Sequence, residues 1–252
     1  MCSLEKSSNI FILTLTGNDE HRLNPTLLES IRIDLKQVRT NAKPGSVLIT
    51  TAQGKFFSNV ADLKYTAAAG SPTGTYDRIL EMSDIFKFLV ADLLSLPMPT
   101  IAAVSGHAAG AGFMLSLSHD YVLMRKDKGI LYMSELNIGL TFIGYAMALL
   151  KSKIPSSTVR RDAVEMGIFD SAYDTAEETK EAALKLAVKL GSNKWNGQVY
   201  ADIRMNSFPE ICELFGFVAS FKSVVPVSLS FENQISFPAT TICYLNVRIS
   251  LI

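Results

Sequence analysis

Short apolar segments with strand character alternate with amphipathic helical segments over most of this 252-residue chain. Such alternation is typical of α/β proteins, in which helices cover a sheet, and it constrains the fold more than any other feature of the sequence. The clearest helix start is Asn24-Pro25, where a capping residue precedes a proline at the first helical position. The pattern predicts strands at 9–16, 46–51, 100–104, 121–124 and 130–133, and helices at 25–40, 79–94, 113–118, 141–151 and 176–190.

Composition excludes several classes of protein. Hydrophobic residues make up 48% of the chain and its formal net charge is zero, which argues against a disordered chain. Because 24 basic residues balance 24 acidic ones, no strong field attracts nucleic acid or an anionic membrane. Cys2, Cys212 and Cys243 form no C-x-x-C pair, so neither a zinc site nor a disulfide framework is indicated. Prolines and glycines interrupt the longest uncharged stretch, Leu93–His119, so we expect a soluble, intracellular chain without a membrane-spanning helix.

The composition changes near residue 205. From Pro209 to Ile252 charged residues become sparse, the apolar runs are β-like and no helical period is visible. We therefore predict a main domain over 1–205 and an atypical C-terminal segment over 206–252.

The glycine-rich segment 106–112 follows a predicted strand and opens a predicted helix. It is not a P-loop, because no lysine follows Gly110 or Gly112, and it is not a Rossmann turn, because position 115 is leucine. Two interpretations remain. The turn either directs backbone N–H groups at a negatively charged group beside a helix start, or it needs small residues so that two backbones pass closely.

A second loop, Gly54–Leu63, carries an acid and two aromatic residues. Asp62 is placed to cap a following helix by accepting hydrogen bonds from its first N–H groups. Phe56 and Phe57 are expected to fill the core rather than to bind a ligand.

Glu135 follows the apolar segment 130–133. A carboxylate at a strand end is either solvated or catalytic, and its position alone leaves both interpretations open. His21, His107 and His119 share no metal-ligand spacing, so all three are interpreted as structural or exposed, and no metal site is expected.

Two segments together resemble the crotonase (enoyl-CoA hydratase/isomerase) superfamily. They are Gly-Lys-Phe-Phe-Ser-Asn-Val-Ala-Asp-Leu at 54–63 and Met-Pro-Thr-Ile-Ala-Ala-Val-Ser-Gly-His-Ala-Ala-Gly-Ala-Gly at 98–112. The second segment matches the superfamily pattern P-x-I-A-A-V-x-G-x-A-x-G-x-G, and the resemblance covers about residues 9–205. Residues 118–124 and 131–136 are further similar to the plant monofunctional Δ3,Δ2-enoyl-CoA isomerases.

The resemblance implies both a fold and a site. The implied fold is a spiral of ββα units, assembled as a trimer or as a dimer of trimers. The implied substrate is an acyl-CoA whose thioester oxygen lies between the backbone N–H groups of Ala61 and Ala111, with Glu135 as the catalytic acid–base. CoA is part of the substrate, no metal or other cofactor is implied, and the expected compartment is the peroxisome. The implied substrate-binding positions are Ser58, Asn59, Val60, Asp62, Leu63, Gly110 and Met114.

The resemblance also separates two reactions. Hydratases of the superfamily use two carboxylates, whereas this chain has Met114 at the first position and Glu135 at the second. A double-bond shift needs one base that removes a proton from C2 and returns it at C4, which favours a Δ3,Δ2-enoyl-CoA isomerase of fatty-acid β-oxidation. An apolar wall beside Glu135 would raise the pKa of its carboxyl group and so help it return the proton. The alternatives are an acyl-CoA binder or assembly partner without catalysis, an enoyl-CoA hydratase and a thioester hydrolase. Candidate wall residues besides Met114 are Phe113, Leu136, Phe142 and Ile143.

Three departures from the superfamily stand out. Val60 precedes Ala61 at a position where the superfamily usually has glycine, and the chain is short between Asp162 and Glu165. Residues 209–252 do not resemble the superfamily's C-terminal helices. The chain ends in Ser-Leu-Ile rather than in a peroxisomal Ser-Lys-Leu-type tripeptide, so the peroxisome is expected from the resemblance alone and the cytoplasm otherwise.

Overall fold

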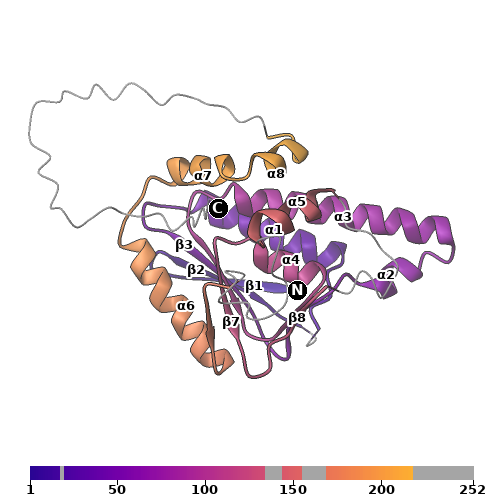
Figure 1. The fold of residues 1–252 in the computed structure, drawn as a ribbon, viewed down its shortest axis with the longest axis horizontal. Helices are drawn as coiled ribbons and strands as arrows, with labels where there is room; N and C mark the ends of the chain where they lie inside the picture. The colour runs from indigo at the N-terminus through magenta and orange to yellow at the C-terminus, as the bar shows by residue number, and fades with distance from the viewer. Residues whose placement is uncertain (18–19, 134–143, 155–168, 218–252) are drawn as a thin grey trace, which may run out of the picture. The chain divides into compact units, whose positions relative to one another are not determined.

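The computed structural model describes residues 1–17, 20–133, 144–154 and 169–217, all within one compact unit, Met1–Ala219 (Figure 1). Its elements in chain order are β1 (Cys2–Ser7), β2 (Ile10–Leu15), α1 (Pro25–Thr40), β3 (Val47–Ala52), β4 (Phe56–Asn59), α2 (Leu63–Ala67), α3 (Pro72–Leu94), β5 (Thr100–Val104), β6 (His107–Ala109), α4 (Ala111–Leu117), β7 (Tyr121–Arg125), β8 (Leu131–Tyr132), α5 (Gly144–Lys153), β9 (Ser171–Tyr173), α6 (Ala176–Gly191), α7 (Gly197–Asn206) and α8 (Pro209–Leu214).

Two sheets organise these elements. The larger sheet has the strand order β1-β2-β3-β5-β7-β9, and the smaller has the order β4-β6-β8. β1 pairs with β2 in antiparallel fashion, and the other described pairings are parallel. From β3 onward the chain repeatedly places one strand in the larger sheet and the next in the smaller sheet, and then forms a helix. This arrangement confirms the predicted α/β fold and its ββα units.

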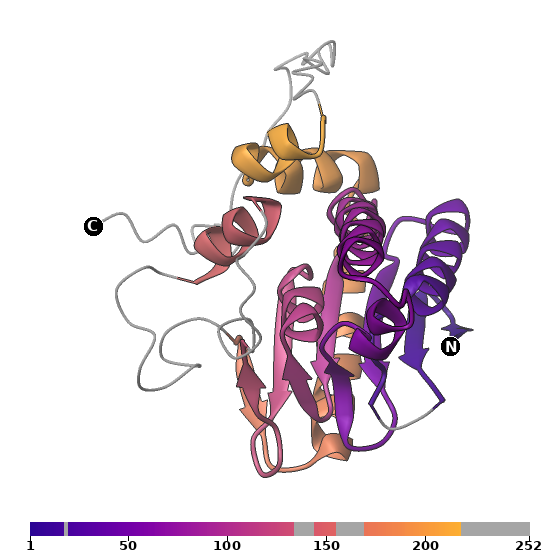
Figure 2. The same ribbon diagram turned by 90° about the vertical axis from the view of Figure 1, so that its right-hand side faces the viewer.

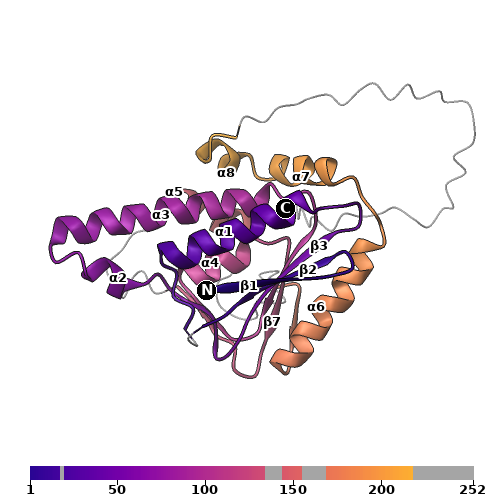
Figure 3. The ribbon, with the colours of Figure 1, turned by 180° about the vertical axis from the view of Figure 1, so that it is seen from behind.

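Helices cover both faces of the larger sheet (Figures 1 and 3). α6 packs on one face, while α1 and α4 lie on the other. Successive residues of a strand point to opposite faces, so a strand covered on both sides is buried throughout, as β3 and β5 are. The residues that face α6 alternate with those that face the main core. The α6-facing cluster contains Val47, Ile49, Ile101, Ala103, Leu123, Ala183, Ala187 and Leu190, and the main core contains Leu48, Ala52, Ala102, Val104, Val122 and Met124.

Local signals predicted some elements well and others poorly. α1 begins and ends as predicted, with the Asn24 side chain accepting a hydrogen bond from the backbone N–H of Leu27 (3.0 Å). α3 starts earlier than predicted, because Ser71 caps it and Pro72 occupies its first position. β4 and β6 were expected to be loops. Each is short, and the pairing of β4 with β6 and of β6 with β8 makes them strands.

The expectation of no helical period after Pro209 is wrong for residues 209–214, which form α8. Pro209 occupies the first helical position, and the buried side chains of Ile211 and Cys212 pack inward. α8 contacts α5, and the unpredicted helix α7 contacts α3 (Figure 2). The predicted boundary near 205 stays a prediction.

A buried ion pair fastens α7 to the rest of the unit. The Arg204 Nε atom lies 2.6 Å from Asp120 Oδ1, and its Nη2 atom lies 2.6 Å from Asp120 Oδ2. The two side chains are only 4% and 15% exposed. The guanidinium also donates to four backbone carbonyl groups at and beyond the end of α3, those of Leu93, Leu94, Leu96 and Met98.

Candidate active site

The loop that follows β4 makes a left-handed turn at Val60, whose φ is +52°. Before the turn, the Asn59 N–H donates to the carbonyl group of Glu20 (2.8 Å), and the Val60 N–H donates to the carbonyl group of Ala109 (3.1 Å). After the turn, the Val60 carbonyl group accepts from the Leu23 N–H (3.0 Å). In a regular strand the N–H and C=O groups of one residue point to the same side. At Val60 the N–H points to Ala109 and the C=O points to Leu23, so the turn rotates the peptide that joins residues 60 and 61.

This rotation fixes the direction of the Ala61 amide. The carbonyl group of residue 60 and the N–H of residue 61 belong to one trans peptide and point in opposite directions. Because the Val60 carbonyl group faces Leu23, the Ala61 N–H faces away from Leu23. The Asp62 N–H then donates back to the carbonyl group of Leu23 (2.8 Å), which leaves the Ala61 N–H directed away from that segment.

A second turn, at Gly110, directs the Ala111 amide in the same manner. Gly110 has φ +49°, and its N–H donates to the carbonyl group of Tyr132 (2.9 Å). Its carbonyl group accepts from the Met114 N–H (3.0 Å) and so points along α4. The Ala111 N–H therefore points out of the start of α4, where no side chain caps the helix.

Close packing of glycine brings the two turns together. A Cβ atom at Gly112 would lie 2.2 Å from the carbonyl oxygen of Ser58, so only glycine allows the first turn of α4 to rest on β4. A Cβ atom at Gly106 would likewise lie 2.2 Å from the carbonyl oxygen of Lys55. Asn59 pairs with Ala109 across the two strands. The close-packing interpretation of the glycine-rich segment is therefore confirmed at Gly106 and Gly112. Gly110 provides the turn, and the interpretation that its amides bind a negatively charged group stays a prediction.

The side chains of the first loop are occupied by structural hydrogen bonds. The fully buried Ser58 donates its hydroxyl group to the carbonyl group of His21 (2.8 Å). Asp62 caps α2 as predicted, because its Oδ1 atom accepts from the backbone N–H groups of Lys64 (3.1 Å) and Tyr65 (3.3 Å). Its Oδ2 atom accepts from the side chain of Asn24 (3.2 Å). The groups that loop 58–63 can offer to a ligand are therefore backbone groups rather than the side chains of Ser58 and Asp62.

Tyr132, the last residue of β8, also belongs to this region, although it was not predicted from the sequence. Its hydroxyl group donates to the Asn59 side-chain oxygen (3.4 Å), and its carbonyl group accepts from Gly110. It therefore contacts both turns. The only local signal was its position three residues before Glu135.

The predicted apolar wall is described in part. Phe113 and Met114 are buried in α4, and both belong to the main core. Leu63 is 37% exposed at the start of α2. The catalytic candidate and the other wall candidates lie outside the described residues: Glu135, Leu136, Phe142 and Ile143.

The histidines have structural surroundings. In His119, Nδ1 lies 3.0 Å from the carbonyl oxygen of Leu115 and Nε2 lies 2.8 Å from Thr50 Oγ1, and burial lowers its pKa to about 4. His21 is buried and its Nδ1 atom contacts the carbonyl oxygen of Phe56, while His107 packs against the Phe56 ring. The described part of the chain contains no group of three or more His, Cys, Asp or Glu residues arranged to hold a metal ion. It also contains no helix long and apolar enough to cross a membrane.

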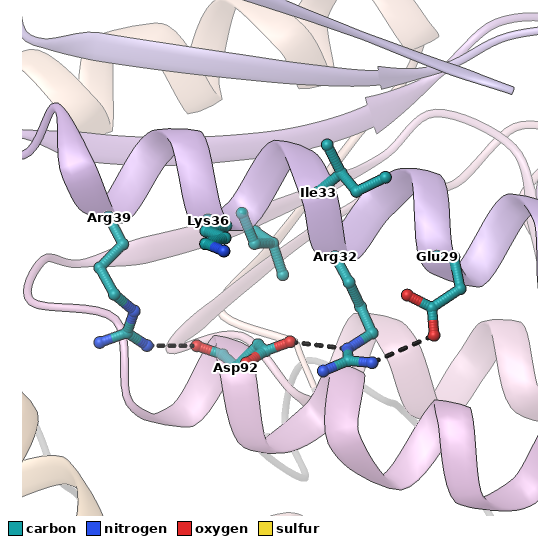
Figure 4. A pocket seen from close by; sticks show the side chains of 7 residues that line it. Glu29, Arg32, Ile33, Lys36, Arg39 and Asp92 are labelled. Carbon is teal, nitrogen blue, oxygen red and sulfur yellow. Dashed lines mark hydrogen bonds and ion pairs between the residues drawn. The ribbon is translucent and has the colours of Figure 1, made fainter.

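A separate surface groove of about 300 Å³ lies between α1 and α3 (Figure 4). Arg32 pairs there with Asp92 (2.9 Å) and with Glu29 (3.1 Å), and Arg39 donates to the backbone carbonyl groups of Asp92 and Ser95. These charges bind one another and tie the two helices together. None of the residues that line the groove belongs to the two turns.

Most of the chain matches one protein family. A family model described as enoyl-CoA hydratase/isomerase matches residues 5–196. The chain belongs to this family. It is 50% identical over 229 residues to "Enoyl-CoA delta isomerase 2, peroxisomal" of Arabidopsis thaliana, a match that covers 86% of this chain and 95% of the relative. It is 49% identical to "Enoyl-CoA delta isomerase 1, peroxisomal" of the same plant, covering 84% and 91% of the two chains.

Solved structures of this family share the fold. The apo structure of an enoyl-CoA isomerase from Mycobacterium tuberculosis superposes with a TM-score of 0.73 at 20% identity, covering 85% of this chain and 94% of that chain. An enoyl-CoA hydratase from Mycobacterium ulcerans gives a TM-score of 0.74 at 21% identity, with the same coverage. Proteins named for either reaction thus share this architecture, so the reaction has to be argued from the site.

Proposed function

We propose that this protein is a Δ3,Δ2-enoyl-CoA isomerase, which converts a 3-enoyl-CoA to the 2-enoyl-CoA. The observation that carries the proposal is the pair of turns at Val60 and Gly110, which leave the Ala61 and Ala111 amides directed away from their own segments. The curated relatives at about half identity are named for this reaction. Unsaturated acyl-CoA thioesters are the corresponding substrate class.

The two amides supply the electrostatic part of the reaction. Loss of a proton from C2 sends the electron pair of the C–H bond into the thioester and places negative charge on its oxygen. Backbone N–H groups at fixed positions stabilise that charge, and removal of one such donor in other enzymes costs about 2.7–4 kcal/mol of transition-state stabilisation, or about 100- to 1,000-fold in kcat. We assign this role to the Ala61 and Ala111 N–H groups.

Glu135 is the proposed base. Its carboxylate removes the C2 proton, and the resulting carboxylic acid returns a proton at C4, so the double bond moves to C2–C3 and no atom is gained or lost. Tyr132, whose carbonyl group contacts the Gly110 N–H, precedes Glu135 by three residues. From this short separation, at most about 11 Å of extended chain, we infer that Glu135 acts beside the Gly110 turn.

The buried Met114 side chain favours isomerisation over hydration. Met114 lies on α4 at the first of the two positions where hydratases of the family carry a carboxylate. Methionine neither activates water nor transfers a proton. A single carboxylate is sufficient for a proton shuttle between C2 and C4.

The remaining parts of the proposal concern assembly and location. We infer that the chain forms a homo-trimer or a hexamer and acts in the peroxisome, where two of its curated relatives are placed by their names. No metal or separate cofactor takes part in the proposed reaction.

The test is an isomerase assay on the purified full chain with a 3-enoyl-CoA. We expect turnover by the wild type and loss of turnover in Glu135→Gln, with acyl-CoA binding retained. The matched control is Glu213→Gln, which removes an exposed carboxylate on α8 and leaves turnover unchanged. Full activity of Glu135→Gln contradicts the assignment of the base. Tight acyl-CoA binding by a wild type without turnover supports the non-catalytic binder, and water addition to a 2-enoyl-CoA supports the hydratase.

A further inference from the structure

Val60 has an unusual backbone conformation for its side chain. A positive φ brings the Cβ atom of an L-residue close to its own backbone, and a branched Cβ makes the crowding worse. Among the described non-glycine residues with positive φ, Val60 is the β-branched one. These residues are Ser8, His21, Val60 and Lys194.

Hydrogen bonds on both sides of Val60 hold it in this conformation. Its N–H donates to Ala109 of β6, and its carbonyl group accepts from Leu23. The flanking residues are also fixed, because the Asn59 N–H donates to Glu20 and the Asp62 N–H donates to Leu23. Strain that persists under so many constraints is a recurrent property of functional sites.

We propose that Val60 is a positioning residue for the oxyanion-binding amide of Ala61, an inference that rests on the proposed isomerase function. Its left-handed turn rotates the 60–61 peptide so that the Val60 carbonyl group meets Leu23 and the Ala61 N–H is directed to the opposite side. With an ordinary negative φ, residue 60 would direct its own carbonyl group toward β6, and the Ala61 N–H would turn toward Leu23. The backbone conformation acts on the reaction, whereas the valine side chain adds only strain.

The first test compares Val60→Gly with Val60→Ala by thermal and chemical unfolding. At most positions alanine gives the more stable protein, because glycine loses more conformational freedom on folding. At a residue with positive φ the order reverses, and we expect Val60→Gly to be the more stable variant. A more stable Val60→Ala contradicts the left-handed turn, and this result does not depend on any activity.

The second test measures kcat and KM for Val60→Pro and Val60→Gly. Proline fixes φ near −65°, which turns the Ala61 amide away, so we expect kcat to fall about 100-fold, as for loss of one oxyanion donor, with KM changed far less. Val60→Gly keeps the turn and is expected to keep the wild-type kcat. Wild-type kcat in a folded Val60→Pro contradicts the proposal.

Two further outcomes separate the proposals. Loss of kcat in Val60→Gly, with stability and KM retained, contradicts the positioning role, because glycine accommodates the turn. If Val60→Pro does not fold, the relative stability of Val60→Gly and Val60→Ala still tests the turn, and the kcat of Val60→Gly still tests the positioning role. A wild type without turnover contradicts the proposed function, and the stability comparison then still tests the turn independently.

Discussion

The two ends of α4 are built in opposite ways. At its start, Gly110 and Gly112 contribute no side chain, and the Ala111 N–H is left without a cap. Just beyond its end, the side chains of His119 and Asp120 are buried or half-buried and each makes several hydrogen bonds. In the proposed function the start of α4 supplies a backbone donor for chemistry, whereas the side chains just beyond its end hold the helix in place.

This contrast between the two ends of α4 predicts where substitutions affect stability and where they affect turnover. At the end of α4, Asp120 accepts from Arg204 and from the backbone N–H of Thr100 (2.8 Å), and Lys153 donates to the carbonyl group of His119 (3.0 Å). None of these groups belongs to the two turns. We therefore expect changes at the end of α4 to lower the free energy of unfolding, and changes at its start to lower kcat.

The largest expected effect follows Arg204→Met. The substitution leaves Asp120 as a buried charge without its partner and removes the donor to four carbonyl groups. Breaking one half of a buried ion pair costs about 3–5 kcal/mol of unfolding free energy. The matched control is Arg32→Met, whose partly exposed pair with Asp92 contributes less than about 1 kcal/mol. Urea unfolding measures both, and equal losses contradict the contrast between the buried pair and the partly exposed one.

The next effect is expected at the start of α4. Gly112→Ala places a methyl group 2.2 Å from the Ser58 carbonyl oxygen, so α4 must shift, and we expect kcat to fall about 100-fold, as for loss of one oxyanion donor. Gly106→Ala meets Lys55 at the same distance but lies at the other end of β6. Both variants should lose stability by overpacking, about 1–3 kcal/mol, but only Gly112→Ala should lose kcat disproportionately. Equal kinetic losses contradict the placement of the site.

A smaller effect concerns pH. Burial lowers the pKa of His119 from 6.5 to about 4, so the folded state disfavours the charged ring. The stabilisation is complete above pH 6.5 and is lost as the pH falls toward 4, because the unfolded chain then binds the proton first. Between pH 7 and pH 5 the free energy of unfolding should drop by about 2 kcal/mol from this residue alone.

The control for the pH effect is His119→Asn, in which this part of the pH dependence should disappear even if the overall stability is lower. Asp120 acts in a separate window. Burial raises the pKa of its carboxyl group, but the charge and hydrogen bonds of Arg204, the charge of Lys153 and the Thr100 N–H together outweigh burial. The net pKa is therefore lowered below its ordinary value, and the stabilisation is lost only in more acidic solution. An unchanged slope between pH 7 and pH 5 in His119→Asn contradicts the assignment.

Local signals explain which parts of this fold could be predicted from the sequence. Asn24-Pro25 and Asp62 are helix caps whose partners lie within three residues, and both act as predicted. β4 and β6 could not be predicted in this way, because each is made a strand by a segment far along the chain. The hydrogen bonds of Arg204 to Asp120 and to the Leu96 carbonyl group could not be predicted for the same reason, because these partners lie far from Arg204 along the chain.

The residues of the candidate site could be named from the sequence, but the geometry of their backbone could not. The family pattern identified Ala61 and Ala111, and a departure from that pattern singled out Val60, which stands where the superfamily usually has glycine. The direction of each amide depends on hydrogen bonds from Leu23, Ala109 and Tyr132, which a local pattern does not contain. Glu135 was identified by the family pattern alone and lies outside the described residues.

The most direct measurement is a crystal structure of Glu135→Gln with a 3-enoyl-CoA bound. The account predicts that the Ala61 and Ala111 nitrogens both lie about 2.7–3.1 Å from the thioester oxygen, with the residue 135 amide beside C2 and C4. A thioester oxygen that contacts neither amide, or a residue 135 side chain remote from C2, would contradict it.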